Sequence, residues 1–120
     1  VMTQLGVSAD SIVMNVGSAA VGYGYEYVVS TLDRIKAAAL SQDDKMLQMP
    51  IITPIASETW TVKEAMATEE ESPEWGSQEV RGVSMEIQTA AASLASGSDA
   101  VILKHPQSVA TISKMIRELM

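Results

Sequence analysis

Three short apolar runs divide the chain and predict strands. They lie near residues 12–15, 50–55 and 100–104, carry almost no charged side chains and are too short for helices. Continuous apolar runs of this length are typical of parallel strands that helices cover. Pro54 cannot donate to a strand ladder, so we expect the second strand to be short.

Longer stretches after these runs have apolar residues at three- and four-residue spacing, which predicts amphipathic helices. The expected helices span residues 26–40, 61–67, 83–96 and 106–119. Thr61 and Glu64 have the spacing of a capping box, which favours a helix start at Thr61. Gly97 stands where a helix commonly ends, and Pro106 suits a first helical turn.

The order of these elements predicts an α/β fold of parallel strands joined by helical crossovers. Three strands fit either a small three-layer sheet or part of a (β/α)8 barrel. No linker or repeat divides the chain, so we treat residues 1–120 as a single domain. Because the chain starts at Val1 without an initiator methionine, we expect a partial domain from a longer protein.

The composition narrows the class of protein. Of the 120 residues, 15 are acidic and 8 are basic, which gives a formal net charge of −7. The basic residues are dispersed, so we expect no nucleic-acid partner. No apolar run approaches the roughly 20 residues that span a bilayer, and we expect a cytoplasmic protein without membrane contact. The chain has no cysteine, so any iron–sulfur cluster must sit on a partner chain.

A glycine-rich loop follows the first expected strand and leads into a helix. Asn15 is its first polar side chain, and Gly17, Gly22 and Gly24 follow within ten residues. Glycine permits positive φ and lets another molecule approach the backbone closely. Because α/β proteins hold ligands at this position, the loop is expected to be the binding end of a βα unit. The alternative is a tight turn in which Asn15 bonds only to its own loop.

Four short motifs, in the same order, resemble one known family. They are Gly22-Tyr-Gly-Tyr-Glu26, Lys45-Met-Leu-Gln-Met-Pro50, Pro73-Glu-Trp-Gly76 with Arg81-Gly82, and Ala100-Val-Ile-Leu-Lys-His-Pro106. This set is similar to the small subunit of the corrinoid iron–sulfur protein, which in archaea is the delta subunit of the acetyl-CoA decarbonylase/synthase complex. The similarity covers nearly all 120 residues and resembles the C-terminal part of that longer subunit. It implies the last three βα units of a TIM-type (β/α)8 barrel.

The resemblance also implies a function in the acetyl-CoA (CO dehydrogenase/acetyl-CoA synthase) pathway of one-carbon metabolism, as in methanogenesis. The small subunit and its large partner would form a heterodimer that encloses a cobalt corrinoid. The corrinoid would accept a methyl group from a methyltetrahydropterin methyltransferase and pass it to acetyl-CoA synthase. The large subunit would carry the iron–sulfur cluster. This chain would cap the corrinoid and dock the methyltransferase, without a catalytic residue of its own.

From this resemblance, the expected corrinoid-binding residues are Asn15, Gly17, Ser18, Gly22 and His105, and no residue is expected to bind a metal. His105 is the only histidine and ends the third expected strand. It could contact the cofactor, or it could cap the helix that begins at Pro106. The Asp-x-His-x-x-Gly motif that supplies a cobalt ligand in other cobalamin-binding proteins is absent from the sequence.

Two features of the long connection after the second strand stay open, and a third has a plain interpretation. Trp60 and Trp75 could anchor a subunit interface or fold back onto their own domain. Arg81 could clamp an anion or pair with Glu79 or Glu86. The three consecutive glutamates at 69–71 have no histidine or aspartate at ligand spacing, so we interpret them as a solvated surface.

An enzyme is the rival interpretation. In that case the chain would be a fragment of a pterin-dependent methyltransferase barrel, a class that holds the pterin ring with Asp and Asn at strand ends. Asn15 is the only match in this sequence, because no aspartate stands at the carboxyl end of an expected strand.

Overall fold

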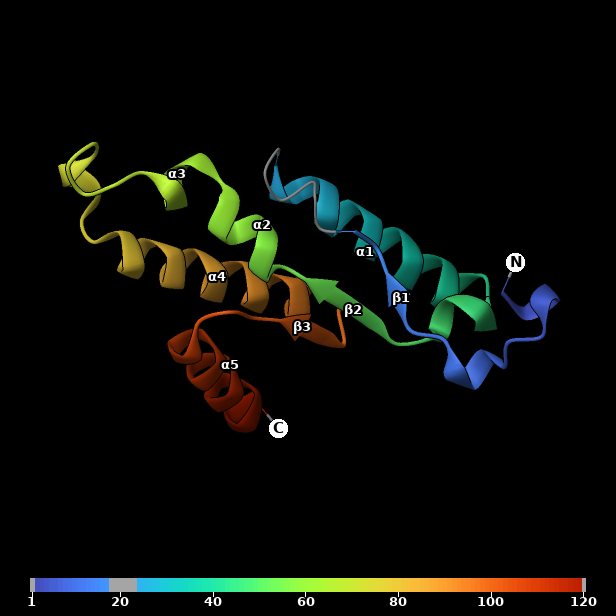
Figure 1. The fold of residues 1–120 in the computed structure, drawn as a ribbon. Coiled ribbons are helices and arrows are strands. Elements are labelled where there is room, and N and C mark those ends of the chain that lie inside the picture. Colours follow the sequence, from blue (N-terminus) through green and yellow to red (C-terminus); the bar gives the residue numbers. More distant parts are fainter. Residues whose placement is uncertain (1, 18–23, 120) are drawn as a thin grey trace.

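The computed structural model describes residues 2–17 and 24–119, which form a parallel three-stranded sheet with helices beside it (Figure 1). The middle strand of the sheet is β2, and the strands are β1 (Met14–Asn15), β2 (Ile51–Pro54) and β3 (Ala100–Ile102). Met14 pairs with Ile51, and Thr53 pairs with Val101, both in parallel register. The predicted parallel strands are confirmed, although each is shorter than the apolar run that predicted it.

The helices of the described residues are α1 (Tyr25–Ser41), α2 (Ala56–Thr61), α3 (Lys63–Met66), α4 (Gln78–Ala95) and α5 (Pro106–Leu119). Short 3-10 helices lie at Thr3–Leu5, Ala9–Ser11, Lys45–Gln48 and Pro73–Trp75. The helices predicted over 26–40 and 106–119 are confirmed to within a residue at each end. Ser96 is the C-cap of α4, and Gly97 follows it with a φ of +119°, so the predicted helix end at this glycine is confirmed to within a residue. In this part of the chain, no helix combines the length and the apolar character needed to cross a membrane.

Two predictions for the connection after β2 are wrong. Thr61 opens no helix: it is the last residue of α2, and its Oγ1 donates to the Ser57 carbonyl oxygen over 2.7 Å. That bond occupies the hydroxyl within the preceding turn, so Thr61 cannot cap the next helix. The second error concerns α4, which begins at Gln78 rather than near residue 83. Gly82, which as a glycine looks like a helix breaker, therefore lies inside the helix.

Among the residues that the structure describes, the helices pack on one face of the sheet. On that face, Ile51 and Thr53 are fully buried. The side chains that alternate with them point to the opposite face, where Val13 is 58% exposed and Ile102 is 46% exposed. One bare face and one helix-covered face are what a segment of a barrel wall would have, and closure into a (β/α)8 barrel stays a prediction.

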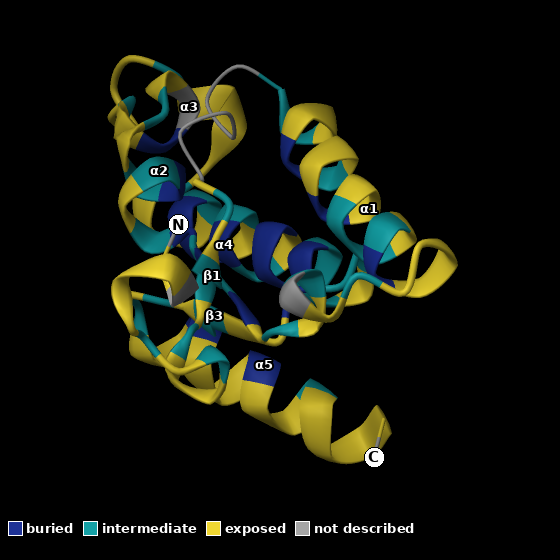
Figure 2. Ribbon diagram, turned by 90° about the vertical axis from the view of Figure 1, so that its right-hand side faces the viewer, coloured by how far each residue is buried: buried dark blue, intermediate teal, exposed yellow. Residues whose placement is uncertain are grey.

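Two apolar clusters hold the helices on the sheet. The first joins Val28 and Leu32 of α1 to Ile51 in β2. The second is centred on Ile55, directly after β2, and includes the buried residues Ala90 of α4 and Ile112 of α5. Figure 2 shows buried stretches along α1 and α4, whereas α5 is exposed over most of its length. The side of the sheet that faces these helices is therefore the hydrophobic core.

Candidate functional site

The segments that leave β2 and β3 at their carboxyl ends meet beside α4. β2 continues into α2, which carries Trp60, and β3 continues into Lys104 and His105. The first half of α4 supplies two glutamates to the same place. We call the following five residues the edge cluster: Trp60, Glu79, Glu86, Lys104 and His105.

Glu86 is a fully buried carboxylate at the centre of the edge cluster. Its Oε2 accepts hydrogen bonds from Trp60 Nε1 at 2.7 Å and from the Lys104 backbone N–H at 3.0 Å. Its Oε1 accepts a third from the His105 backbone N–H at 3.1 Å. A buried charge is costly unless such donors compensate it. One side chain therefore ties α4 to α2 and to the segment that enters α5.

The same contacts determine the protonation of Glu86. Burial alone would raise its pKa. The nearby Ser108 hydroxyl, the backbone N–H groups of Lys104 and His105, and the Trp60 indole outweigh this effect and hold the pKa below its ordinary value. Glu86 is therefore ionised at neutral pH.

The ring of His105 is held by three neighbours. Its Nδ1 accepts a hydrogen bond from the Gln107 backbone N–H at 3.1 Å, so the ring caps the start of α5. Nδ1 carries no proton in this arrangement, and the neutral ring therefore has its proton on Nε2. Nε2 lies 2.8 Å from Glu79 Oε1, to which it donates. The Trp60 ring stacks on the imidazole with 5.9 Å between centroids and 13° between planes.

Trp60 reaches this position because α4 has a glycine beneath its ring. A Cβ at Gly82 would overlap the ring, so a larger residue could not sit there without moving Trp60. The Lys104 ammonium lies 5.7 Å from the centre of the same ring, within the range of a cation–π contact. Gly82 thus permits the close approach of α2 and α4 on which the edge cluster depends.

His105 does not offer a free nitrogen to a cofactor metal. Nδ1 is engaged by the start of α5 and Nε2 by Glu79. Among the side chains that the structure describes, no group of three or more acidic or histidine residues could hold a metal ion. The capping alternative for His105 is therefore observed, and its contact with a cofactor stays a prediction.

The end of β1 carries the other described binding residues. Asn15 Oδ1 accepts a hydrogen bond from the Gly17 backbone N–H at 2.8 Å, which is the local turn that the sequence left open, and Gly17 has a φ of +78°. Asn15 pairs with Ile52, whereas β2 continues to Pro54, so β1 stops short of the level at which the edge cluster begins. The predicted residues Ser18 and Gly22 lie outside the described part of the chain.

Trp75 and Arg81 form a second cation–aromatic pair near the start of α4. The Arg81 guanidinium carbon lies 5.7 Å from the centre of the Trp75 ring, and Nη2 donates to the Ala67 carbonyl oxygen at 2.8 Å. Glu79 contacts His105 and Glu86 accepts a hydrogen bond from Trp60, and an ion pair of Arg81 with either carboxylate stays a prediction.

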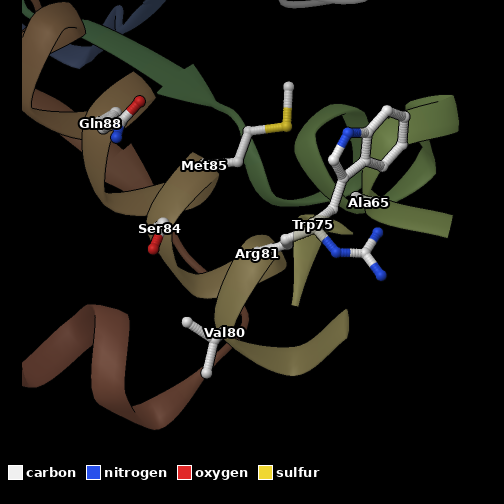
Figure 3. Close-up of a pocket in the computed structure, with 7 residues that line it drawn as sticks. All are labelled: Ala65, Trp75, Val80, Arg81, Ser84, Met85 and Gln88. Carbon is white, nitrogen blue, oxygen red and sulfur yellow. The ribbon is translucent and has the colours of Figure 1, made fainter. Parts of the chain in front are cut away.

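An open hollow of about 450 Å³ lies between α3, α4 and the Pro73–Trp75 turn (Figure 3). Its lining is largely apolar and consists of Ala65, Trp75, Val80, Arg81, Ser84, Met85 and Gln88. Trp75 also lines a second hollow of about 660 Å³, on the side of Met66 and Glu71. The ring of Trp75 thus stands between two hollows, whereas Trp60 belongs to the edge cluster.

Sequence reasoning did not single out Glu86 or Gly82 as structural determinants of this site. A signal for both existed, because the buried positions of α4 recur every three or four residues. They are Gly82, Val83, Glu86, Thr89, Ala90 and Ser93. A glutamate on such a line must be buried and must find donors in the neighbouring elements.

Comparisons with a family model and with individual curated proteins identify the same family. The sequence model of the family described as CO dehydrogenase/acetyl-CoA synthase delta subunit matches residues 1–116. The chain is 34% identical to acetyl-CoA decarbonylase/synthase complex subunit delta 2 of Methanosarcina acetivorans, over 98% of this chain and 27% of that protein. It is 34% identical to the subunit delta of Archaeoglobus fulgidus, over 92% of this chain and 25% of that protein. The chain thus spans about a quarter of the length of these curated relatives.

Proposed function

The chain belongs to the family of the CO dehydrogenase/acetyl-CoA synthase delta subunit, and from this premise we propose that it is part of a methyl-carrier subunit. Together with a large partner subunit, it would enclose a cobalt corrinoid. It would cap the corrinoid and dock the methyltransferase that delivers a methyl group on its way to acetyl-CoA synthase. The observation that carries this proposal is the family match over residues 1–116, in a chain whose strand ends gather at one edge of a parallel sheet.

The described residues fit a corrinoid at its periphery rather than at the cobalt. Asn15 and Gly17 are exposed at the end of β1, and the Asn15 amide nitrogen can donate while its Oδ1 holds the local turn. His105 has both ring nitrogens engaged, so it suits a positioning role in the neighbouring loop. A bound corrinoid would itself supply the cobalt that accepts and releases the methyl group. This chain would orient the ring and exclude water from it.

The bare face of the sheet supports assembly with further protein. Val13 and Ile102 expose apolar surface that the helices of this chain do not reach. Covering such surface contributes about 25 cal/mol for each Å² removed from water. A chain with this face therefore gains stability when another wall of protein lies against it.

Purification of the chain with its partners tests the proposal. A tagged chain produced together with the other subunits should co-purify with a cluster-bearing partner and show cobalt-corrinoid absorption in the visible spectrum. Asn15→Leu should lower the cobalt content of the complex, because it removes the amide donor and places a bulky side chain at the end of β1. The control Glu69→Gln/Glu70→Gln should retain the cobalt, since both side chains are exposed on a distant loop.

A complex without corrinoid absorption would contradict the proposal. Loss of cobalt in the glutamine control, with Asn15→Leu unaffected, would show that the binding face is misassigned. Binding of a tetrahydropterin by the chain without any partner would support the methyltransferase alternative instead.

A further inference from the structure

The net charge of the chain is concentrated in one segment. Residues 58–79, which we call the acidic connection, contain seven acidic side chains and one basic side chain. The rest of the chain contains eight acidic and seven basic residues and is nearly neutral. The exposed members include Glu69, Glu70, Glu74 and Glu79. The acidic connection therefore presents a local negative field rather than a share of an evenly acidic surface.

Apolar side chains are exposed within and beside this acidic connection. Trp75 is 46% exposed, Met66 is 59% exposed and Val80 is 62% exposed. Trp75 and Val80 line the hollow of about 450 Å³ (Figure 3). Trp75 and Met66 line the hollow of about 660 Å³. Single exposed apolar residues are ordinary on a protein surface, but several gathered around hollows with a polar rim mark an interaction site.

The Trp75 ring is held in its exposed position. It ends a 3-10 turn, and Gly76 follows it with a φ of +76°. The Arg81 guanidinium lies against the ring and donates to the carbonyl oxygens of Ala67 at 2.8 Å and Gly76 at 3.4 Å. A preformed aromatic anchor loses little conformational freedom on binding, which is the character of interface hot spots.

We propose that the two hollows beside Trp75 form a docking surface for a basic amphipathic segment of a partner protein. The apolar side of that segment fills the hollows on either side of Trp75, and its lysines or arginines lie against the exposed glutamates of the acidic connection. The charge favours this occupant over a second copy of the chain, because a copy would bring the same acidic connection and only dispersed basic residues. The inference involves no corrinoid, so its failure and that of the proposed function are distinguishable.

A labelled synthetic helix tests this surface on the full 120-residue chain. The probe has lysines on one side and leucines on the other, and its counterpart has glutamates in place of the lysines. We expect the lysine probe to bind, with an affinity that falls as salt is added, and the glutamate counterpart not to bind. Carbodiimide coupling, which joins carboxylates to lysine amines, should link the bound probe to glutamates of the acidic connection, as read by mass spectrometry.

Matched variants separate this surface from the general charge of the chain. We expect probe binding to weaken about tenfold in the triple variant Glu69→Gln/Glu70→Gln/Glu74→Gln. The control removes the same charge elsewhere and is Asp10→Asn/Asp33→Asn/Glu118→Gln. In the control, the affinity for the probe should change less than about twofold. Glu71 is left intact because its carboxylate and backbone exchange hydrogen bonds with Thr68. Trp75→Ala should weaken binding about tenfold or more, and Leu40→Ala, at an 81% exposed position on α1, should not.

Equal loss of affinity in the two charge variants overturns the proposal, as do cross-links spread over all exposed acidic residues. Unchanged binding of the lysine probe by Trp75→Ala also overturns the proposal. A dimer of the chain that sedimentation shows to depend on Trp75, without binding of the lysine probe, would assign the surface to a second copy instead. Circular dichroism of each variant checks that it is folded.

Discussion

The two tryptophans lie in the same connection between β2 and α4 and have contrasting environments. Trp60 donates a hydrogen bond to the buried Glu86, stacks on His105 and rests over Gly82. Trp75 stays 46% exposed, with a guanidinium against its ring. Both rings contact residues of α4, and the α4 residue beside each ring determines whether the indole is buried or exposed. Where α4 has a glycine and a carboxylate acceptor, the indole packs inward; where it has Arg81, the indole stays at the surface.

This difference shows why residue type alone does not predict which aromatic side chain stabilises a fold. An indole can be buried only if its N–H finds an acceptor and its ring finds space. Trp60 has both, and we therefore expect it and its partners to contribute to the stability of the chain. Trp75 is half-exposed beside two open hollows, so its contribution should appear in binding.

Glu86→Gln should have the largest effect. The amide retains one oxygen acceptor but turns its own NH₂ group toward donors, so at least one buried N–H group loses its partner. We expect the free energy of unfolding to fall by about 2–3 kcal/mol in urea titrations. Glu79→Gln is the control, because Glu79 is 72% exposed and its contact with His105 is a surface interaction. A loss that is equal in both variants would mean that Glu86 is not the centre of the edge cluster.

Acid should reproduce part of this loss. The pKa of Glu86 is lowered in the folded chain by hydrogen bonds that outweigh its burial, so the carboxylate stabilises the fold at pH values above the ordinary glutamate pKa. That contribution is lost as the pH falls through the lowered value. Thermal unfolding followed by circular dichroism from neutral pH to about pH 3 should show this loss. The slope should be shallower in Glu86→Gln, and identical slopes would contradict the assignment.

Gly82→Ala tests the space beneath Trp60. Alanine favours a helix interior over glycine by about 1 kcal/mol, but its Cβ would overlap the Trp60 ring. We expect a net destabilisation of about 1–2 kcal/mol in the chain with Trp60. In a Trp60→Ala background the same change should become stabilising, because the clash is gone. The same sign in both backgrounds would show that Trp60 does not depend on Gly82.

Trp75→Ala should have the smallest effect on stability. At a half-exposed position, we expect the free energy of unfolding to change by about 0.5 kcal/mol or less. The variant leaves Trp60 as its only tryptophan. Its fluorescence should therefore be quenched less by acrylamide than that of Trp60→Ala, which keeps Trp75. Equal quenching of the two variants would remove the contrast between the rings.

Sequence reasoning predicted the regular parts of the fold and missed the contacts between them. The apolar runs located β2 and β3, and helical spacing located α1 and α5, because one-dimensional periodicity follows directly from burial of one face. The start of α4 was missed, since a glycine at position 82 is unfavourable in a helix unless a neighbour requires the space. That neighbour is Trp60, which is distant in sequence.

The candidate site shows the same limit. His105 was singled out as the only histidine at the end of a strand, and its place at the start of α5 followed from Pro106. Its two hydrogen bonds could not be predicted, because Glu79 comes from a different element of the chain. Glu86 was considered only as a partner for Arg81. A long-range set of donors from α2 and the β3–α5 segment, none adjacent to Glu86 in sequence, determines its role.

The central position of β2 bears on the order in which the chain folds. Both ladders of the sheet join segments several tens of residues apart, Met14 with Ile51 and Ile52 with Ala100. Helices of the length of α1 and α4 form on a microsecond timescale, whereas parallel pairing must first close the long intervening loops. The helices should therefore form before the sheet, and β2 should pair with β1 and β3 only afterwards. The amide protons of Ile52 and Thr53, in the middle of this strand, are then expected to become protected from solvent exchange late in folding.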